Sequence, residues 1–157
     1  MDMRLDDRDR LILDILQQDS STPVNDIADK VSLSLSACAR RIKRLEDEGY
    51  VLKRVALLSR PAMGVPTTVF VAIRNARHAA EWHEPFTRLL ADIPEIVEAH
   101  RLTGEIDYIL KIVAPNVEAY DDIYKLLTKK LEFTGVSAYI SMETLKSTTA
   151  LPTGYAR

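Results

Sequence analysis

The sequence predicts an α+β fold in which three short N-terminal helices precede a βαββαβ unit. Three observations predict it. Apolar residues recur at helical spacing in three short segments before residue 50. After residue 66, β-branched segments and helical segments follow the order strand, helix, strand, strand, helix, strand. The two halves of that order form a weak repeat, which indicates an antiparallel sheet with both helices on one face.

These patterns divide the 157 residues into a helical domain at 1–50, a strand or linker at 51–66 and an α/β domain at 67–157. A hydrophobic content of 46% is ordinary for a globular protein, so both domains have material for a core. One face of the predicted sheet lacks cover in so small a domain. We therefore expect a second subunit to bury it, which makes the protein a homodimer.

The first two helices have clear start and stop signals. Asp6 is a good N-cap for a helix over Asp6–Gln18, whose first turn is acidic. Thr22 as N-cap and Pro23 at the first helical position begin the second helix. Their packing faces are Leu5, Ile12, Ile15 and Leu16 in the first, and Val24, Ile27, Ala28 and Val31 in the second.

The third helix is predicted over Ser34–Gly49, with Ser34 as N-cap and Gly49 in a left-handed C-terminal cap. A thin apolar stripe runs along it, and four cationic side chains occur within residues 40–44. Such a helix packs by its stripe and offers its other side to a polyanion. Three short helices with a tight turn before a basic third one predict a helix-turn-helix, whose last helix enters a DNA major groove.

Charge is distributed unevenly, although the net charge is only −2. Residues 1–29 carry three arginines against eight aspartates, whereas residues 30–60 carry eight basic side chains against three acids. The acids of the third helix come only at its end, so we expect no i,i+4 partner to neutralise its positive part. The alternative is a solvated helix whose arginines only keep it soluble.

The base-edge candidates are Ser36, Arg40 and Lys43, because arginine grips guanine bidentately and serine pairs with several base edges. Ala37 is placed to meet a thymine methyl group. Arg41, Arg44 and Lys53 or Arg54 are expected to hold phosphates and set the register on the duplex. For each arginine, a solvated or intramolecularly paired side chain is the alternative. The expected DNA-binding residues are Ser34, Ser36, Ala37, Arg40, Arg41, Lys43, Arg44 and Arg54.

After the third helix, Tyr50–Leu58 alternates or runs apolar like a strand. It has two possible fates, a short hairpin or wing (giving a winged-type helix-turn-helix) and a linker arm. The later strands are predicted over Thr67–Arg74, Ile96–Leu102, Ile106–Ala114 and Val136–Leu145, and the helices over Ala80–Asp92 and from the cap Asn116 to about Glu132.

One loop of the second domain has the makings of a ligand site. In Thr103–Tyr108, Gly104 leaves backbone N–H groups open to a carboxylate, and Asp107 offers a counter-charge to an α-amino group. The alternative, which the residues alone favour, is a tight hairpin whose Asp107 satisfies its own turn.

Enzymatic and metal chemistry find little support. Cys38 is the only cysteine and lies on the apolar stripe, so we expect it in the core and the protein in a reducing cytoplasm. His78, His83 and His100 lack metal-ligand spacing, and no Gly-rich phosphate loop or nucleophile elbow occurs. No segment resembles a signal peptide or a membrane span. We expect neither an enzyme nor a cofactor.

Several segments, in their order and spacing, resemble the Lrp/AsnC family of regulators, also called feast/famine proteins. The resemblance extends from Leu5 to Pro152 and rests on LDDRDRLILDILQQD, SLSACARRIKRLEDEGYV, LLSRPAMG, VFVAI, IPEIVEAHRLTGEIDYILKI and ISMETLKSTTALP. It implies a helix-turn-helix joined to a ferredoxin-like domain that binds amino acids and drives dimer-to-octamer assembly. The residues that match the family's recognition-helix pattern are Ser34, Cys38, Arg40, Arg41, Arg44, Leu45, Glu46 and Gly49.

The same resemblance bears on the loop. Gly104 and Asp107-Tyr108 match the family's Gly-Asp-Tyr-Asp-Tyr effector motif, but Glu105-Ile106 replaces its middle, and Ser32 stands where the family usually has a turn glycine. A neighbouring dimer is implied to complete the pocket. The expected effector-binding residues are Leu102, Thr103, Gly104, Asp107, Tyr108, Ser137, Tyr139 and Ser141.

The expected function is therefore that of a sequence-specific DNA-binding transcriptional regulator whose assembly and DNA binding respond to an amino acid. Its partners are double-stranded DNA, the effector and further copies of the chain, as a homodimer or octamer, with no membrane. Two alternatives stay open: an enzyme related to haem-pathway decarboxylases, whose architecture some relatives share, and an effector-binding assembly protein that does not bind DNA.

Overall fold

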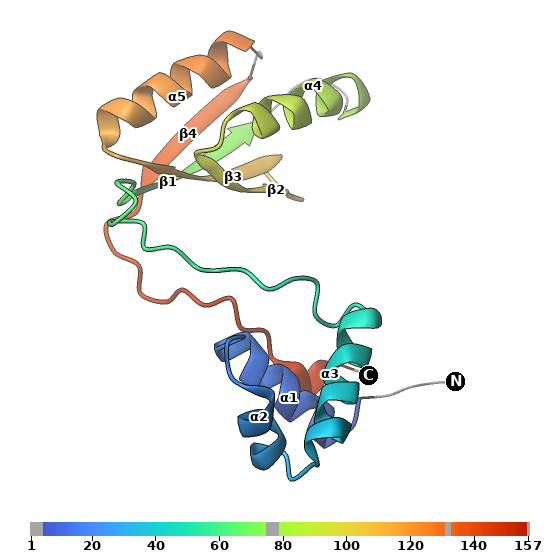
Figure 1. Ribbon diagram of the computed structural model, residues 1–157. Coiled ribbons are helices and arrows are strands. Elements are labelled where there is room, and N and C mark those ends of the chain that lie inside the picture. The colour runs from blue at the N-terminus through green and yellow to red at the C-terminus, as the bar shows by residue number, and fades with distance from the viewer. Residues whose placement is uncertain (1–4, 75–78, 131–132, 157) are drawn as a thin grey trace. The chain divides into compact units, whose positions relative to one another are not determined.

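The computed structural model describes residues 5–74, 79–130 and 133–156 (Figure 1). The chain divides into two compact units, which are Met1–Ala56 together with Lys146–Arg157 (unit 1) and Leu57–Leu145 (unit 2). Residues 146–157 differ from our expectation, which placed them in the second domain. Within the described residues, none of the helices combines the length and the apolar character that crossing a bilayer requires.

Unit 1 contains the three expected helices. Asp6 caps the first, because its carboxylate accepts the backbone N–H of Asp9 at 2.8 Å while the Asp9 side chain accepts that of Asp6 at 3.2 Å. Fully buried side chains from all three helices make one core, in which Cys38 lies as expected. The helices are α1 (Asp7–Gln18), α2 (Val24–Lys30) and α3 (Leu35–Asp47).

The start of α2 differs from the prediction. Pro23 occupies the cap position, and no side chain caps this helix. Thr22 was expected as the cap, but its hydroxyl donates to the carbonyl of Asp19 at 2.8 Å. The Thr22 hydroxyl thus pairs with a backbone carbonyl at the end of α1 and does not cap α2.

Both ends of α3 follow the prediction. The hydroxyl of Ser34 accepts the backbone N–H of Ala37 at 3.3 Å. Gly49 has φ +80°, and the following N–H of Tyr50 returns to the carbonyl of Leu45 at 2.9 Å. Ser32 takes φ 53° in the turn before α3, so serine adopts the left-handed geometry there.

The segment after α3 forms neither a strand nor a wing. Residues 52–59 have no regular secondary structure, and Leu52 is 90% exposed. An isolated strand has nothing to pair with in unit 1, and a strand without partners is unstable in water. Of the two predicted alternatives for this segment, a hairpin or wing and a linker arm, the structure shows the linker arm.

Unit 2 is the expected βαββαβ domain. All three strand pairs are antiparallel, in the order β2-β3-β1-β4, and α4 and α5 cover one face of the sheet (Figure 1). Asn116 caps α5 by accepting the N–H of Ala119 at 2.8 Å. The elements are β1 (Thr67–Arg74), α4 (Ala79–Asp92), β2 (Ile96–Arg101), β3 (Tyr108–Ala114), α5 (Val117–Lys130) and β4 (Gly135–Ile140).

The last strand is shorter than the predicted Val136–Leu145. It pairs only with β1, which begins at Thr67, and the final contact is the Ser141 N–H donated to the carbonyl of Thr68 at 2.9 Å. Beyond that point no strand remains beside it. Strand length here is decided by the neighbouring strand and not by local propensity.

Alternate residues of the sheet face opposite ways. The buried residues of β1 and β3 on the helix side, such as Val69, Val71 and Leu110, pack beneath Phe86 and Leu127. On the other side none of the described helices or strands of unit 2 covers the sheet, and Phe70 and Tyr139 lie opposite each other across strands β1 and β4. We call this second side the open sheet face. Tyr139 is 61% exposed there.

Candidate nucleic-acid interface and ligand loop

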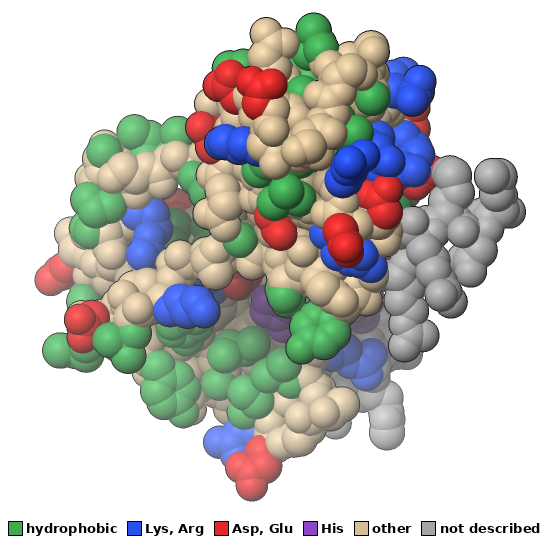
Figure 2. Space-filling model, turned by 90° about the horizontal axis from the view of Figure 1, so that it is seen from below, with side chains coloured by type: hydrophobic (Ala, Val, Ile, Leu, Met, Phe, Trp, Pro, Cys, Tyr) green, Lys and Arg blue, Asp and Glu red, His purple; other side chains and the backbone are tan. Residues whose placement is uncertain are grey.

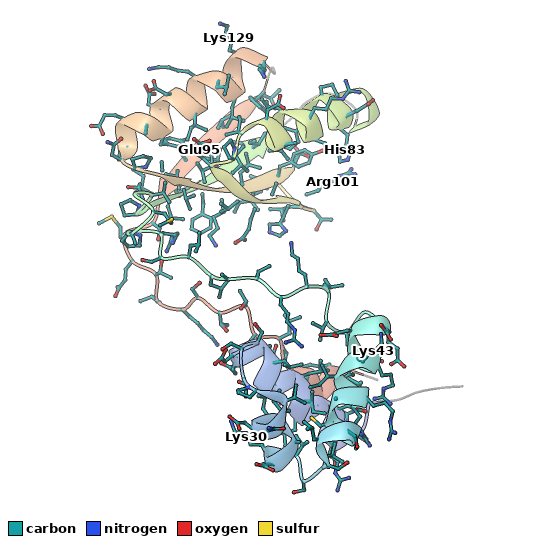
Figure 3. The ribbon with its side chains drawn as sticks, in the orientation of Figure 1. Lys30, Lys43, His83, Glu95, Arg101 and Lys129 are labelled. Atoms are coloured by element: carbon teal, nitrogen blue, oxygen red, sulfur yellow. The ribbon has the colours of Figure 1, made fainter. Side chains whose placement is uncertain are left out.

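Three of the predicted base-edge residues share one exposed side of α3. Ser36, Arg40 and Lys43 are exposed and follow one another at i, i+4 and i+7, so they lie along one face of the helix. Lys43 projects outward from α3 (Figure 3), and its Nζ lies 2.9 Å from an Asp47 carboxylate oxygen. Both side chains of this pair are exposed to solvent. No carboxylate of the described residues pairs with Arg40. This helix therefore offers a row of donors to a partner.

Arg41 and Arg44 point instead toward α1. Asp9 is only 1% exposed, and its two carboxylate oxygens meet Arg41 Nη1 at 2.9 Å and Arg44 Nη2 at 2.6 Å. Arg41 Nη1 also reaches Asp6 at 2.6 Å. Partial burial raises the Asp6 pKa, but the hydrogen bond and the charge of Arg41, together with the hydrogen bonds that Asp9 makes to Asp6, hold that pKa below its ordinary value.

The expectation that no i,i+4 partner neutralises the positive part of α3 is wrong, and acids from another helix neutralise it as well. Residue spacing within α3 could not indicate the acidic partners of Arg41 and Arg44, because Asp9 lies in α1 and Asp6 is its N-cap. The i,i+4 pairs Lys43–Asp47 and Arg44–Glu48 also form, the second at 3.9 Å. In the view of Figure 2, basic side chains lie beside acidic ones and do not form an unbroken patch.

Arg54 is held on unit 1. Its guanidinium donates to Glu46 Oε1 at 2.8 Å and to the carbonyl of Ser20 at 3.1 Å. Lys53, the predicted alternative, is exposed and has no carboxylate partner in the described part of the chain. Ser34 uses its hydroxyl as a cap, and Ala37 is half-buried beside it. Among the predicted cations, Arg40 and Lys53 are thus exposed with no carboxylate partner in the described residues, whereas Lys43 and Arg54 each pair with an acid of α3.

The predicted ligand loop is a tight connection between β2 and β3. The N–H of Leu102 donates to the carbonyl of Asp107 at 2.8 Å, and the N–H of Asp107 donates to the carbonyl of Ile73 at 2.9 Å. Thr103 and Gly104 are exposed between them, and Gly104 has φ +122°. The loop thus presents an exposed backbone at the end of the sheet.

The structure does not bring all the expected effector residues together within one chain. Tyr108 lies in the core, where its ring meets that of Phe86 edge-on with centroids 4.8 Å apart. Ser137 pairs with Ala72 near the loop end of the sheet, whereas Ser141 adjoins the start of β1. The two serines are four positions apart along the chain, which in an extended strand is a distance of about 13 Å.

Sequence analysis missed a polar group on the open sheet face. Lys111 Nζ lies 2.6 Å from Glu98 Oε1, and His100 Nε2 lies 3.7 Å from Glu98 Oε2. The hydrogen bond from Lys111 lowers the Glu98 pKa below its ordinary value. The alternation of polar and apolar residues along β2 and β3 could have indicated that these side chains share a face. Only the pairing register of the two strands places Glu98 beside Lys111. The described residues hold no group of three metal-ligating side chains, and His78 lies outside them.

Comparison with known proteins identifies both domains. The model of the Lrp/AsnC ligand binding domain matches residues 68–151, and that of a winged helix-turn-helix DNA-binding domain matches residues 5–51. The HTH-type transcriptional regulator Zrp of Zymomonas mobilis is 50% identical over 96% of this chain and 99% of its own length. The glutamate uptake regulatory protein of the same organism is 43% identical over 95% of this chain and 91% of its own.

Solved structures agree as well. An AsnC family transcriptional regulator from Agrobacterium tumefaciens is 44% identical, with a TM-score of 0.92 over 96% of this chain and 99% of that one. A transcriptional regulator from Neisseria meningitidis, solved in complex with L-Met, is 30% identical with a TM-score of 0.90 over 96% and 97% of the two chains.

Proposed function

The chain belongs to the Lrp/AsnC family of transcriptional regulators, and we propose that its α3 reads specific sequences of double-stranded DNA while an amino acid binds unit 2. A regulator with a DNA-binding helix-turn-helix and a small-ligand domain is not an enzyme. The helix-turn-helix match also removes support from an assembly protein that does not bind DNA.

One observation carries the DNA proposal, the exposed row Ser36, Arg40 and Lys43 on α3. An Arg40 guanidinium with no acidic partner among the described residues can take guanine in a bidentate pair, and the flanking hydroxyl and amine extend the contact along the groove. Arg41 and Arg44 have a different task. Each is already bound to Asp9, so they first position α3 and contact phosphates only with the donors that Asp9 leaves.

The effector proposal rests on the exposed loop Leu102–Asp107 and on two relatives. One was solved with L-Met, and another is named for glutamate uptake. A zwitterion needs a backbone donor for its carboxylate and an acid for its amino group, which Gly104 and Asp107 supply. Because Ser141 lies far from this loop in its own chain, the expected pocket requires a second subunit to be complete.

Assembly follows from the open sheet face. Phe70 and Tyr139 form an apolar surface beside the Lys111–Glu98 pair, and a second copy would bury it in an isologous homodimer. Dimers would then associate further, to an octamer, across the seam that holds the effector. We place the protein in the cytoplasm, where its DNA target lies and where the free, buried thiol of Cys38 is stable.

The direct test is a footprint on the DNA that flanks this protein's own gene, repeated with a mixture of amino acids. We expect a protected segment at physiological salt that changes in extent or affinity with the mixture. Light scattering on the same samples reports the assembly state. An absence of protection even in dilute salt would overturn the DNA proposal, and unchanged mass and affinity with every amino acid would overturn the effector proposal.

A further inference from the structure

The side-chain amide of Gln17, near the end of α1, hydrogen-bonds both backbone groups of one residue in the C-terminal segment. Its Oε1 accepts the N–H of Leu151 at 2.7 Å, and its Nε2 donates to the carbonyl of the same residue at 2.8 Å. An amide that satisfies both backbone groups of one residue imitates a strand pair. The two residues are 134 positions apart in the chain.

Further polar contacts continue along the same side of α1. Arg10 Nη2 donates to the carbonyl of Ala156 at 3.1 Å, and the hydroxyl of Thr153 donates to Asp14 Oδ2 at 3.2 Å. Positions 10, 14 and 17 are spaced i, i+4 and i+7, so they form one stripe along the helix. We call these three side chains the tail stripe. Most of its bonds go to the backbone of residues 151–156, which suits an extended or turn-like segment.

The segment is held by these polar contacts more than by burial. Leu151 and Tyr155 are 74% and 85% exposed, and only Ala156 packs against the core of unit 1. A cavity of about 380 Å³ remains between α1, residues 50–54 and the segment, with walls that include Leu13, Leu16 and Pro152. A segment that leaves a cavity beneath it can leave α1 without opening the helical core.

We propose that the tail stripe is a docking site for the chain's own C-terminal segment, residues 150–156, and that the docked segment is a releasable second tether between the two units. The chain passes between the units once at residues 56–57 and again at 145–146. With the segment docked, unit 2 is linked to unit 1 at both of its ends; with it released, only the connection at residues 56–57 joins them. The proposal rests on the proposed function only in that unit 1 is the DNA-binding part.

The test is amide hydrogen exchange and backbone ¹⁵N relaxation on the full-length protein, comparing Gln17→Ala with the wild type. Two lost hydrogen bonds should speed exchange at the Leu151 amide by about ten- to a hundredfold and increase fast motion over residues 150–156. Gln18→Ala is the matched control, because Gln18 is an exposed glutamine of the same helix. It should leave the segment unchanged.

A second variant guards against general unfolding. Thr153→Val keeps the side-chain shape but removes the bond to Asp14, and it alters no residue of α1–α3. It should raise exchange in residues 150–156 while the amides of α3 keep their protection. Unchanged exchange in both variants would overturn the proposal.

Protection of the segment that falls when the protein is diluted would also overturn it, because the occupant would then be the segment of a second copy. DNA binding, measured on the same samples, separates the two proposals. A wild type that binds no DNA but shows the predicted exchange refutes only the proposed function.

Discussion

Arg41 of α3 donates through Nη1 to the buried carboxylate of Asp9 on α1, across 2.9 Å. The other oxygen of that carboxylate meets Arg44 at 2.6 Å. One nearly inaccessible acid thus holds two arginines of the helix proposed to read DNA. The pairing fixes how α3 lies on α1, and it leaves Arg40 as the arginine of this helix with no acidic partner among the described residues.

Replacing Asp9 by Asn should therefore destabilise unit 1 by about 3–5 kcal/mol, because Arg41 and Arg44 would lose their buried acidic partner and Arg41 would keep only the more exposed Asp6. Chemical denaturation, followed by circular dichroism, measures the change in the free energy of unfolding. Asp7→Asn is the control, since Asp7 is fully exposed and contacts Arg10 only at 3.4 Å. A similar small loss in both variants would contradict the role given to Asp9.

Replacing Arg40 by Ala should weaken binding to a specific duplex by about 1–3 kcal/mol and relax specificity at the base it contacts. The measurement is a titration of specific and random duplexes at one salt concentration. Arg88→Ala, which removes an exposed arginine from α4 in unit 2, controls for the loss of net charge. If affinity for both duplexes falls equally, Arg40 contacts phosphate and not a base.

Acid should destabilise unit 1 through Asp6. Burial raises the pKa of this carboxyl, but the hydrogen bond and charge of Arg41 and the hydrogen bonds with Asp9 together hold the pKa below the ordinary value of 3.8. A carboxyl with a lowered folded-state pKa contributes stability above its unfolded pKa and loses that contribution as the pH falls through the folded one. We expect the loss below about pH 4, and Asp6→Asn, which keeps a good N-cap, should flatten it. An unchanged acid limb of the stability curve in that variant would refute the assignment.

Gly104→Ala should disturb the ligand loop without a steric clash. A Cβ at this position meets nothing within 4 Å, but φ +122° is strained for any L side chain. Strain of this kind costs about 1–3 kcal/mol, so thermal unfolding and amino-acid binding by calorimetry should both weaken. Gly154→Ala, where a Cβ is also unobstructed and φ is not positive, serves as the control. Equal amino-acid binding by the wild type and Gly104→Ala would argue against this loop as the effector site.

Tyr139→Glu should dissociate the proposed homodimer, because a second copy would have to bury an unpaired carboxylate on the open sheet face. Sedimentation velocity should show a dissociation constant raised by about tenfold or more. Val117→Glu places the same charge on a half-exposed residue at the start of α5, away from that face. If Tyr139→Glu and the wild type sediment alike, subunits associate through another surface.

Features set by near neighbours in the chain were predictable. Ser34 and Gly49 bound α3 because capping depends on one side chain and a few adjacent backbone groups. The β-branched run Thr67–Arg74 is a strand over its whole predicted length. The row Ser36, Arg40 and Lys43 also followed from helical periodicity, since one helix places those three residues on one side.

Features that depend on a distant partner were not predictable. Asp9 looked like one more acid of the first turn, and only the packing of α1 against α3 makes it the partner of Arg41 and Arg44. Tyr108 belonged to a ligand motif by its neighbours in sequence, yet the register of β3 turns its ring into the core beside Phe86. The arm after α3 had a strand-like pattern without a strand to pair with.

The amino-acid sequence by itself thus determined the order of helices and strands, the caps of α3 and the residues that α3 exposes, because each depends on contacts a few residues long. Tertiary structure alone decided which charges are neutralised and where β4 ends, and it joined Leu151 to Gln17. Pairing and burial depend on which distant segments pack together, and a local sequence pattern does not determine that packing.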